Sequence, residues 1–311
     1  MTFPSASKYT FRGHKCSYVQ AGTGPPVILL HGFAGSAFNC WRSTIPELAK
    51  TNTVYGLDLL GLGASAQPQE VTYSIDLWRE QCEAFCREKL ADSEEAPIVI
   101  GHSFGSLIAL ELAASDAVDF KAVGMMNCGI GMNNKNAFKE GSGAGETAAA
   151  WQLALFKLVF DDLIGVIFNQ KWLLKYILTS FATADNVRNA LEEGVYVNSE
   201  RVTDDLVDDY LSLASDKEAA VEVLRQIYTN DGGPLPFEAA TALPDSFPIL
   251  TIWGDRDNLA PSTGPVGKFF RAQAQRLGAT EFEEIPAGHV PQDDNPDTTN
   301  RILTEWLARV S

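Results

Sequence analysis

Short apolar segments alternate with amphipathic segments along most of the chain. Runs rich in β-branched and aromatic residues predict strands at 9–12, 14–20, 26–31, 53–58, 96–102, 120–127, 247–254 and 280–285. Between most of them, apolar residues recur every three or four positions, as in YSIDLWREQCEAFCREKL, which predicts helices. This alternation indicates an α/β fold with a mostly parallel central sheet flanked by helices. No helix separates the first two strands, so we expect them to pair antiparallel at an edge.

One long block interrupts the alternation. Between Cys128 and Ala242 we find no convincing strand pattern, and the stretches WQLALFKLVF and LIGVIFNQKWLLKYILTSF are apolar and helical. Charged residues interrupt this apolar half too often for a membrane span of about 20 apolar residues. Because strand-rich sequence resumes afterwards, we predict a core domain, residues 1–127 and 243–311, with residues 128–242 inserted as a helical cap. A separate helical domain is the alternative.

The net charge limits the classes of partner that we expect, and the cysteines indicate the cellular compartment. A formal net charge of −16 over 311 residues repels phosphate backbones, so we expect no nucleic-acid partner. The five cysteines form no CxxC pair and no histidine pair accompanies them, which argues against a metal site and for a reducing, intracellular compartment. The first residues show no apolar targeting run. The sequence does not indicate the oligomeric state.

A serine between two glycines marks the junction of a predicted strand and a predicted helix. The stretch IVIGHSFGSLIAL places Ser103 in a G-x-S-x-G motif, with Gly101 and Gly105 on either side. Such a nucleophile elbow exposes the serine hydroxyl above the sheet edge, near a helix N-terminus that favours developing negative charge. We therefore predict that Ser103 is a catalytic nucleophile, and the alternative is a plain structural turn.

A serine nucleophile needs a base, and the chain has four histidines. We expect His14 to face solvent in an edge strand and His31 to bind loop backbone. His102 precedes Ser103 on a strand, so its side chain should point to the opposite face. His289 remains, in IPAGHVPQDD after the last strand, where the carboxyl edge of a parallel sheet collects functional groups.

The histidine in turn needs an orienting carboxylate. The stretch LTIWGDRDNLAP offers Asp255 and Asp257 after the penultimate strand. We prefer Asp257, at the end of a G-x-x-D turn, and give Asp255 the structural role of capping that turn. The resulting order of Ser103, Asp257 and His289 along the chain is the order of α/β-hydrolase triads.

A tetrahedral intermediate also needs two N–H donors. We expect these to be the backbone N–H of Phe104, after the nucleophile, and of Phe33, in the HGFAGS loop after an early strand. The glycine-rich stretch LDLLGLGAS (57–65) lacks the lysine and the spacing of a phosphate loop, so we interpret it as a structural turn.

Together these motifs resemble the α/β-hydrolase superfamily over nearly the whole chain. HGFAGS, DLLGLGAS, GHSFGS, WGDRDNLAP and AGHVPQDDNP occur in the family's order. FRGHKCSYVQAGTGPPVILLHGFAGS, CWRSTIPELAKTNTVYGLDLLGLGAS, YSIDLWREQCEAF and MMNCGIGMNNK resemble hydrolases of plants, algae and cyanobacteria that include pheophytinase, chlorophyll dephytylase and chlorophyllase. The resemblance implies the α/β-hydrolase fold and a serine esterase that cuts the phytyl ester of chlorophyll-type pigments. Where this resemblance holds, it implies a chloroplast location. Otherwise we expect a cytoplasmic protein.

From these residues we expect a carboxylic ester hydrolase that needs no metal and no cofactor, with a bulky hydrophobic ester as its small-molecule substrate. Candidate substrate-binding residues in the apolar part of the predicted cap are Trp151, Leu155, Phe156 and Phe160. Two alternatives stay open: a C–C bond hydrolase or lyase using the same triad, and a ligand receptor on the same scaffold. The serine disfavours the branches of the fold with an aspartate nucleophile, haloalkane dehalogenases and epoxide hydrolases.

Overall fold

The computed structural model describes residues 3–130, 169–213, 216–229 and 233–310. Its centre is an eight-stranded sheet in the order β1-β2-β4-β3-β5-β6-β7-β8. The strands are β1 (Ala6–Phe11), β2 (His14–Ala21), β3 (Pro26–Leu30), β4 (Thr53–Leu57), β5 (Ile98–His102), β6 (Ala122–Met126), β7 (Ile249–Gly254) and β8 (Thr280–Ile285). In this spatial order, every neighbouring pair from β4 through β3 to β8 is parallel. The pairs β1–β2 and β2–β4 are antiparallel. The predicted mostly parallel sheet and its antiparallel edge are confirmed.

The central strands are apolar throughout because helices cover both faces of the sheet. Every residue of β3, β5 and β6 is buried. Successive side chains of β3 enter different cores: Val27 and Leu29 pack with the helices of one face, and Ile28 and Leu30 with those of the other. A strand buried on both faces needs no polar alternation, which explains its continuous apolar run.

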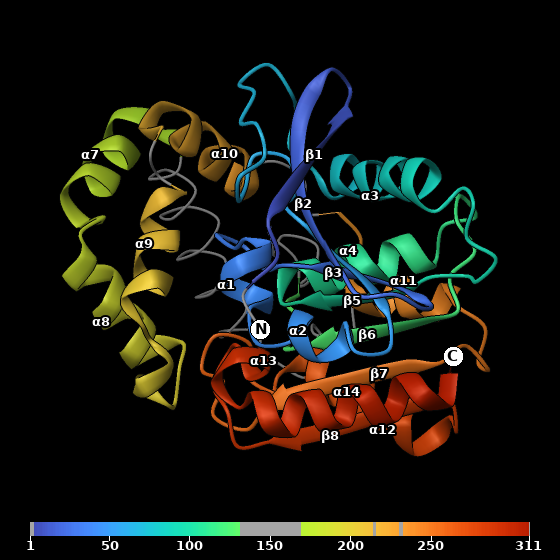
Figure 1. Ribbon diagram of the computed structural model, residues 1–311. Helices are drawn as coiled ribbons and strands as arrows, with labels where there is room; N and C mark the ends of the chain where they lie inside the picture. Colours follow the sequence, from blue (N-terminus) through green and yellow to red (C-terminus); the bar gives the residue numbers. More distant parts are fainter. Residues whose placement is uncertain (1–2, 131–168, 214–215, 230–232, 311) are drawn as a thin grey trace.

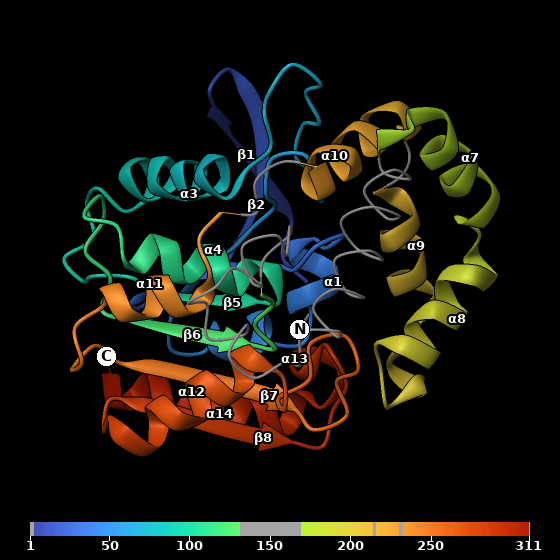
Figure 2. The same cartoon turned by 180° about the vertical axis from the view of Figure 1, so that it is seen from behind.

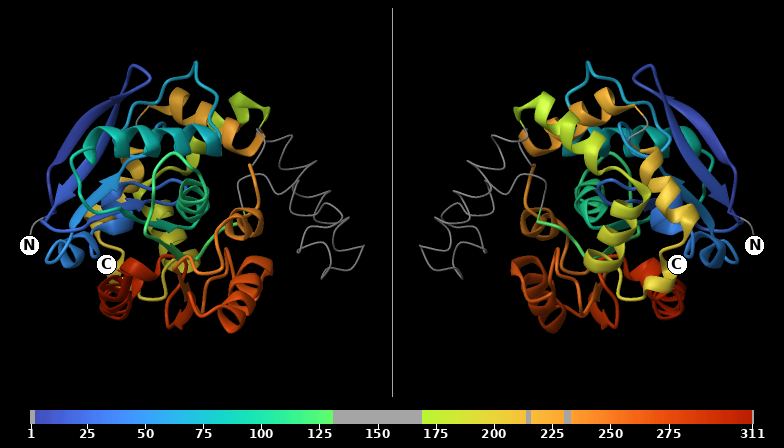
Figure 3. Two further views of the ribbon diagram at one scale, coloured as in Figure 1. Left: turned by 90° about the vertical axis from the view of Figure 1, so that its right-hand side faces the viewer. Right: turned by 90° about the vertical axis from the view of Figure 1, so that its left-hand side faces the viewer.

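One face is covered by α3 (Ile75–Lys89), α4 (Phe104–Ala113), α11 (Pro236–Ala242) and α12 (Pro265–Arg276), and the other by α1 (Ala37–Trp41), α2 (Ile45–Leu48) and α14 (Pro296–Val310). Trp78 and Phe270 are fully buried on the first face, and Trp41 and Trp306 on the second. Figures 1 and 2 show these helices on either side of the sheet. Figure 3 shows the hairpin of β1 and β2, in blue, at the edge opposite the orange and red strand β8.

Further helices lie between β6 and β7 in the sequence. They are α7 (Lys171–Phe181), α8 (Ala184–Gly194), α9 (Asp204–Ser212) and α10 (Lys217–Thr229), with the 3-10 turn η2 (Ser199–Arg201) between α8 and α9. Figure 1 shows α7, α8 and α9 beyond the end of the sheet toward which β7 points. Two of these helices, α8 and α9, pack on each other, and α9 also contacts α1. The carboxyl end of the sheet therefore faces these helices.

The sequence places candidate substrate-binding residues in this inserted region and predicts no membrane-spanning segment. The candidate substrate-binding residues Trp151, Leu155, Phe156 and Phe160 lie outside the described residues. Among the described helices, none combines the length and the apolar composition needed to cross a membrane.

Candidate active site

Ser103 occupies a sharp turn between β5 and α4. Its backbone has φ 50° and ψ −116°, a left-handed region that side-chain-bearing residues rarely adopt and that often marks functional positions. A Cβ at Gly101 would lie 2.2 Å from the carbonyl oxygen of Gly105, and a Cβ at Gly105 would lie 2.4 Å from that of Leu30. Only glycine fits at these two positions, which explains the G-x-S-x-G spacing.

Ser103, His289 and Asp257 are joined by hydrogen bonds. The Ser103 hydroxyl lies 3.0 Å from Nε2 of His289, and Nδ1 of His289 lies 2.8 Å from Oδ2 of Asp257. Because a carboxylate only accepts, the proton of the neutral imidazole sits on Nδ1 and leaves Nε2 free to accept from the serine. The structure thus brings together the three residues predicted as nucleophile, base and acid, although they come from three separate turns after β5, β7 and β8.

The surroundings of Asp257 keep its carboxylate ionised. Burial raises the pKa of this carboxyl, but the hydrogen bond from His289 and backbone donors outweigh burial and hold the pKa below its ordinary value. Oδ1 accepts from the backbone N–H of Leu259 at 2.8 Å and of Ala260 at 3.0 Å. Asp255, the alternative acid, is exposed, and its carboxylate accepts from Ala287 N at 3.3 Å. The geometry therefore sets Asp257, and not Asp255, against the imidazole.

The other three histidines have different partners. His14 lies on β2, with Nε2 3.9 Å from the exposed carboxylate of Glu70. The His31 ring hydrogen-bonds loop backbone as predicted, because Nε2 accepts from Leu59 N at 3.0 Å and Nδ1 lies 2.8 Å from Gly32 O.

The expectation that His102 points away from the site is wrong. Its Nε2 donates to the backbone carbonyl of His289 at 2.7 Å, and the two rings lie 5.1 Å apart. Strand alternation assumes extended backbone on both residues, and the left-handed turn at Ser103 breaks it. Burial, and then the neighbouring His289, lower the pKa of His102 to about 3, so this ring is neutral near neutral pH.

The predicted oxyanion donors lie in segments that adjoin Ser103. Phe104 is the first residue of α4, where backbone N–H groups lack partners within the helix and the dipole favours negative charge. The HGFAGS loop approaches from the other side, since a Cβ at Gly32 would lie 3.3 Å from the Cβ of Ser103. Phe33 follows directly in this loop. The donor roles of Phe33 and Phe104 stay predictions.

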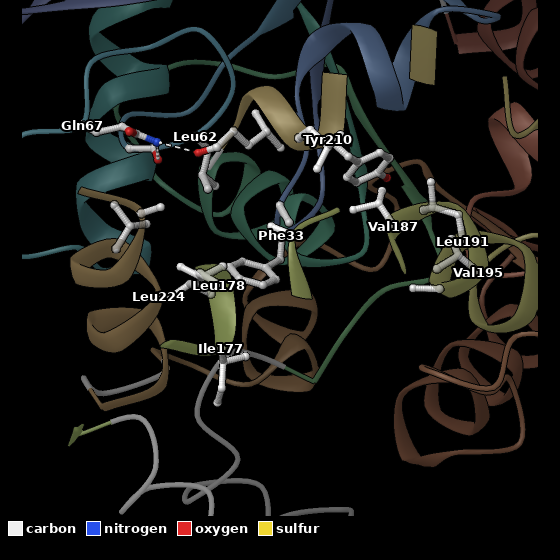
Figure 4. Close-up of a pocket in the computed structure, with 18 residues that line it drawn as sticks. Phe33, Leu62, Gln67, Ile177, Leu178, Val187, Leu191, Val195, Tyr210 and Leu224 are labelled. Atoms are coloured by element: carbon white, nitrogen blue, oxygen red, sulfur yellow. Dashed lines mark hydrogen bonds between the residues drawn. The ribbon is translucent and has the colours of Figure 1, made fainter. Parts of the chain in front are cut away.

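An apolar pocket of about 390 Å³ is lined by Phe33, from the loop that adjoins Ser103, and by Val195, which accepts from His289 N (Figure 4). Its lining comes from the HGFAGS and DLLGLGAS loops and from the helices between β6 and β7, and includes Phe33, Leu62, Ile177, Leu178, Leu191 and Leu224. The amide of Gln67, which also lines the pocket, already donates to the carbonyls of Gly61 and Leu213. Such a surface suits a hydrophobic group of a ligand.

Sequence reasoning missed several residues that hold the His289 loop. The carboxylate of Asp294 accepts from the N–H groups of Gly288, Val197 and Asn198, and His289 N donates to Val195 O at 2.8 Å. The segment after α8 is therefore hydrogen-bonded directly to the loop of the candidate base. Asn127, after β6, was missed as well; a polar residue ending an apolar strand at the carboxyl edge was the one signal available.

Within residues 3–130, 169–213, 216–229 and 233–310, no group of three or more His, Cys, Asp or Glu side chains is arranged to hold a metal ion.

Comparison with known proteins connects this site to a family. The model of a family described as "Alpha/beta hydrolase family" matches residues 27–302. The 2-hydroxymuconate semialdehyde hydrolase of Pseudomonas sp. (strain CF600) is 35% identical over 103 residues, 32% of this chain and 35% of that protein. The soluble epoxide hydrolase of Corynebacterium sp. (strain C12) is 37% identical over 105 residues, 32% of this chain and 34% of that protein. Bifunctional epoxide hydrolase 2 of Sus scrofa is 32% identical over 126 residues, 40% of this chain and 22% of that protein. This chain thus matches about a third or less of the length of these relatives.

Solved structures share the fold over nearly the whole chain. The meta-cleavage product hydrolase from Pseudomonas fluorescens IP01 superposes with a TM-score of 0.67 at 21% identity, covering 98% of each chain. An epoxide hydrolase superposes with a TM-score of 0.70 at 18% identity, covering 99% of each chain. At these identities the likeness concerns the fold alone.

Proposed function

Because the chain belongs to the alpha/beta hydrolase family, we propose that it is a serine hydrolase in which Ser103 attacks the carbonyl carbon of an apolar substrate. The observation that carries this proposal is the chain of hydrogen bonds from Ser103 through His289 to Asp257, at 3.0 and 2.8 Å. A serine on a strained elbow, in line with an imidazole and a buried carboxylate, is the arrangement that activates a hydroxyl for attack.

The hydrogen bonds of Ser103, His289 and Asp257 support the following reaction. His289 Nε2 takes the Ser103 proton as Oγ bonds to the carbonyl carbon, and Asp257 stabilises the imidazolium. The backbone N–H groups of Phe33 and Phe104 bind the oxyanion. His289 then gives the proton to the leaving group as its bond to the carbonyl carbon breaks. Water hydrolyses the resulting acyl-enzyme, with His289 again as the base.

A C–C bond beside a carbonyl is our first candidate for the bond cleaved. Among the relatives is a hydrolase of 2-hydroxymuconate semialdehyde, a compound without an ester, so its hydrolysis has to break a carbon–carbon bond. A meta-cleavage product hydrolase shares the fold over 98% of the chain. The epoxide hydrolases among the relatives support hydrolysis in general. The serine at position 103 disfavours the branches of the fold that use an aspartate nucleophile.

A carboxylic ester with a bulky hydrophobic group is the second candidate, and the apolar pocket favours it. None of the described residues that line this pocket is charged. A semialdehyde acid brings a carboxylate that would need a cation or several donors when buried, whereas an apolar ester needs neither.

The pigment ester and the chloroplast location do not enter this proposal. The curated relatives reported above come from bacteria and a mammal, so the expected closeness to plant and algal pigment hydrolases lacks support.

We further propose that residues 128–242 are inserted into a core of residues 1–127 and 243–311 and form a cap over the site, except that α11, at the end of this range, packs on α4 and covers the sheet with the core helices. The position of α7, α8 and α9 beyond the carboxyl end of the sheet supports this division, as does the apolar pocket that these helices help to line.

The nucleophile is tested with a fluorophosphonate probe and with Ser103→Ala. We expect covalent labelling of Ser103 and a loss of turnover on the order of 10⁶-fold in the alanine variant. Ser115→Ala, at the end of α4, is the control and should behave like the wild type. Labelling at another serine, or a Ser103→Ala variant with near-normal turnover, would exclude this mechanism.

The bond is assigned with two substrate sets: a 2-hydroxy-6-oxo-dienoic acid, and p-nitrophenyl esters of short and long acyl chains. Turnover of the dienoic acid alone supports C–C cleavage. A KM that falls as the acyl chain lengthens supports the apolar ester, since each buried CH₂ contributes about 0.8 kcal/mol. A labelled Ser103 without turnover of either set would favour the ligand-receptor alternative.

A further inference from the structure

Asn127 lies directly after β6, and its side chain contacts the loops of both the acid and the base. Nδ2 donates to Asp257 Oδ2 at 2.5 Å and to the backbone carbonyl of Gly288 at 3.2 Å. Oδ1 accepts from the backbone N–H of Gly254, the last residue of β7, at 3.0 Å. The side chain is fully buried. One amide thus joins the turn that carries Asp257 to the loop that carries His289.

The backbone of Asn127 is in the left-handed region, with φ 45°. Its N–H donates to Ile252 O at 3.0 Å, which ties it to β7. Glycine adopts this conformation without strain, and asparagine is among the side-chain-bearing residues that tolerate it best. The position therefore combines a backbone that would suit glycine with a side chain that makes three hydrogen bonds.

Among side chains of this size, only a primary amide can make all three of these hydrogen bonds. Asp257 and the Gly288 carbonyl both need donors, and Gly254 N needs an acceptor; a primary amide offers two N–H groups and one oxygen. Oδ2 of Asp257 accepts from Asn127 and from His289, while Oδ1 accepts from two backbone N–H groups. With donors on both oxygens, the carboxylate cannot rotate away from the imidazole.

We propose that Asn127 is a positioning residue for the reaction proposed above. Its side chain holds the Asp257 carboxylate and the His289 loop in a fixed position relative to each other. This role rests on the proposed function of Ser103, His289 and Asp257. Asn127 acts through these residues and takes no part in the bonds that form or break.

The main test is Asn127→Gly, which removes the amide and keeps the left-handed backbone free of strain. We expect kcat to fall about 10²-fold, the size of effect that a displacement near 1 Å causes at a catalytic group, while KM stays within about twofold. In the resting protein, the low-field proton NMR signal of the His289 Nδ1–H bonded to Asp257 should shift or disappear.

Gln81→Ala is the matched control. Gln81 is a fully buried amide on α3 that also makes three hydrogen bonds, to Leu60 N, Tyr9 OH and Asp58 O, away from the triad. It should lower stability without changing kcat or the low-field signal. If Asn127→Gly does not fold, Asn127→Asp keeps the size of the side chain but as a carboxylate offers Asp257 no donor, and at pH 8 kcat should fall as well.

A folded Asn127 variant with kcat within twofold of the wild type and an unchanged low-field signal would overturn the inference. Ser103→Ala separates this outcome from failure of the proposed function. An inactive Ser103→Ala beside an unaffected Asn127→Gly removes only the role of Asn127, whereas an active Ser103→Ala removes the proposed function itself.

Discussion

At the scale of single residues, Asp255 and Asp257 are close in sequence but differ in burial and in partners. Asp257 is 4% exposed and accepts from His289, whereas the Asp255 side chain is 42% exposed. We predict that Asp257→Asn lowers kcat about 10⁴-fold, because an amide presents the imidazole in the wrong tautomer. Asp255→Asn should cost less than tenfold. The measurement is steady-state turnover on the best substrate, with circular dichroism to verify the fold.

The opposite ranking of the two variants would make Asp255 the acid, against the geometry of the site. Equal and small losses from both would mean that His289 works without an orienting carboxylate.

At the scale of elements, Glu111 is a partly buried carboxyl on α4, which packs against α3 and α11. Burial raises its pKa to about 7, with Arg79 opposing this and Asp76 and Glu238 adding to it. The folded state therefore holds a proton that the unfolded state releases near pH 4.5. The stability that this proton contributes is fully present below that pH and is lost as the pH rises through 7. We predict that Glu111→Gln gains stability relative to the wild type at pH 8 and not at pH 5.

Urea unfolding of both proteins at the two pH values measures this difference. Glu283→Gln, at an exposed position of β8, serves as the control for removing a carboxylate. If Glu111→Gln changes the free energy of unfolding equally at both pH values, ionisation of Glu111 does not destabilise the folded state.

At the scale of the whole molecule, Asp293 joins three distant parts of the chain. Its carboxylate is fully buried. It accepts from Arg42 and Ser43, which follow α1. It also accepts from Tyr196, which precedes η2, and from Arg201, which ends η2. Burial raises its pKa, but the hydrogen bonds and charge of Arg42 outweigh burial and lower it. We predict that Arg42→Met lowers the free energy of unfolding by about 3 kcal/mol, since it leaves a buried charge with fewer partners.

Urea unfolding measures this loss, and the double variant Arg42→Met/Asp293→Leu is the control. Removing both charges should recover much of the stability, because the cost arises from the unpaired carboxylate. A loss below 1 kcal/mol in Arg42→Met would show that Arg201 and the two hydroxyl groups suffice to hold Asp293.

The sequence by itself determined the elements and the candidate site residues that depend on local pattern. Strand and helix periodicities predicted the eight strands, although β1 extends from Ala6 to Phe11 where 9–12 was expected. G-x-S-x-G predicted the elbow at Ser103, because two glycines around a serine meet a steric demand that acts within five residues. Spacing and elimination predicted Asp257 and His289, since loops at the carboxyl ends of parallel strands meet at one edge.

Only the tertiary structure decided which common groups serve the site. Asn127, Asp294 and the carbonyl of Val195 carry no distinguishing sequence pattern, and each forms a hydrogen bond with Asp257 or with the His289 loop. The inward direction of His102 likewise depends on the turn at Ser103. Hydrogen bonds between residues far apart in sequence depend on the positions of both partners in space, and those positions follow from the packing of the whole sheet and its helices.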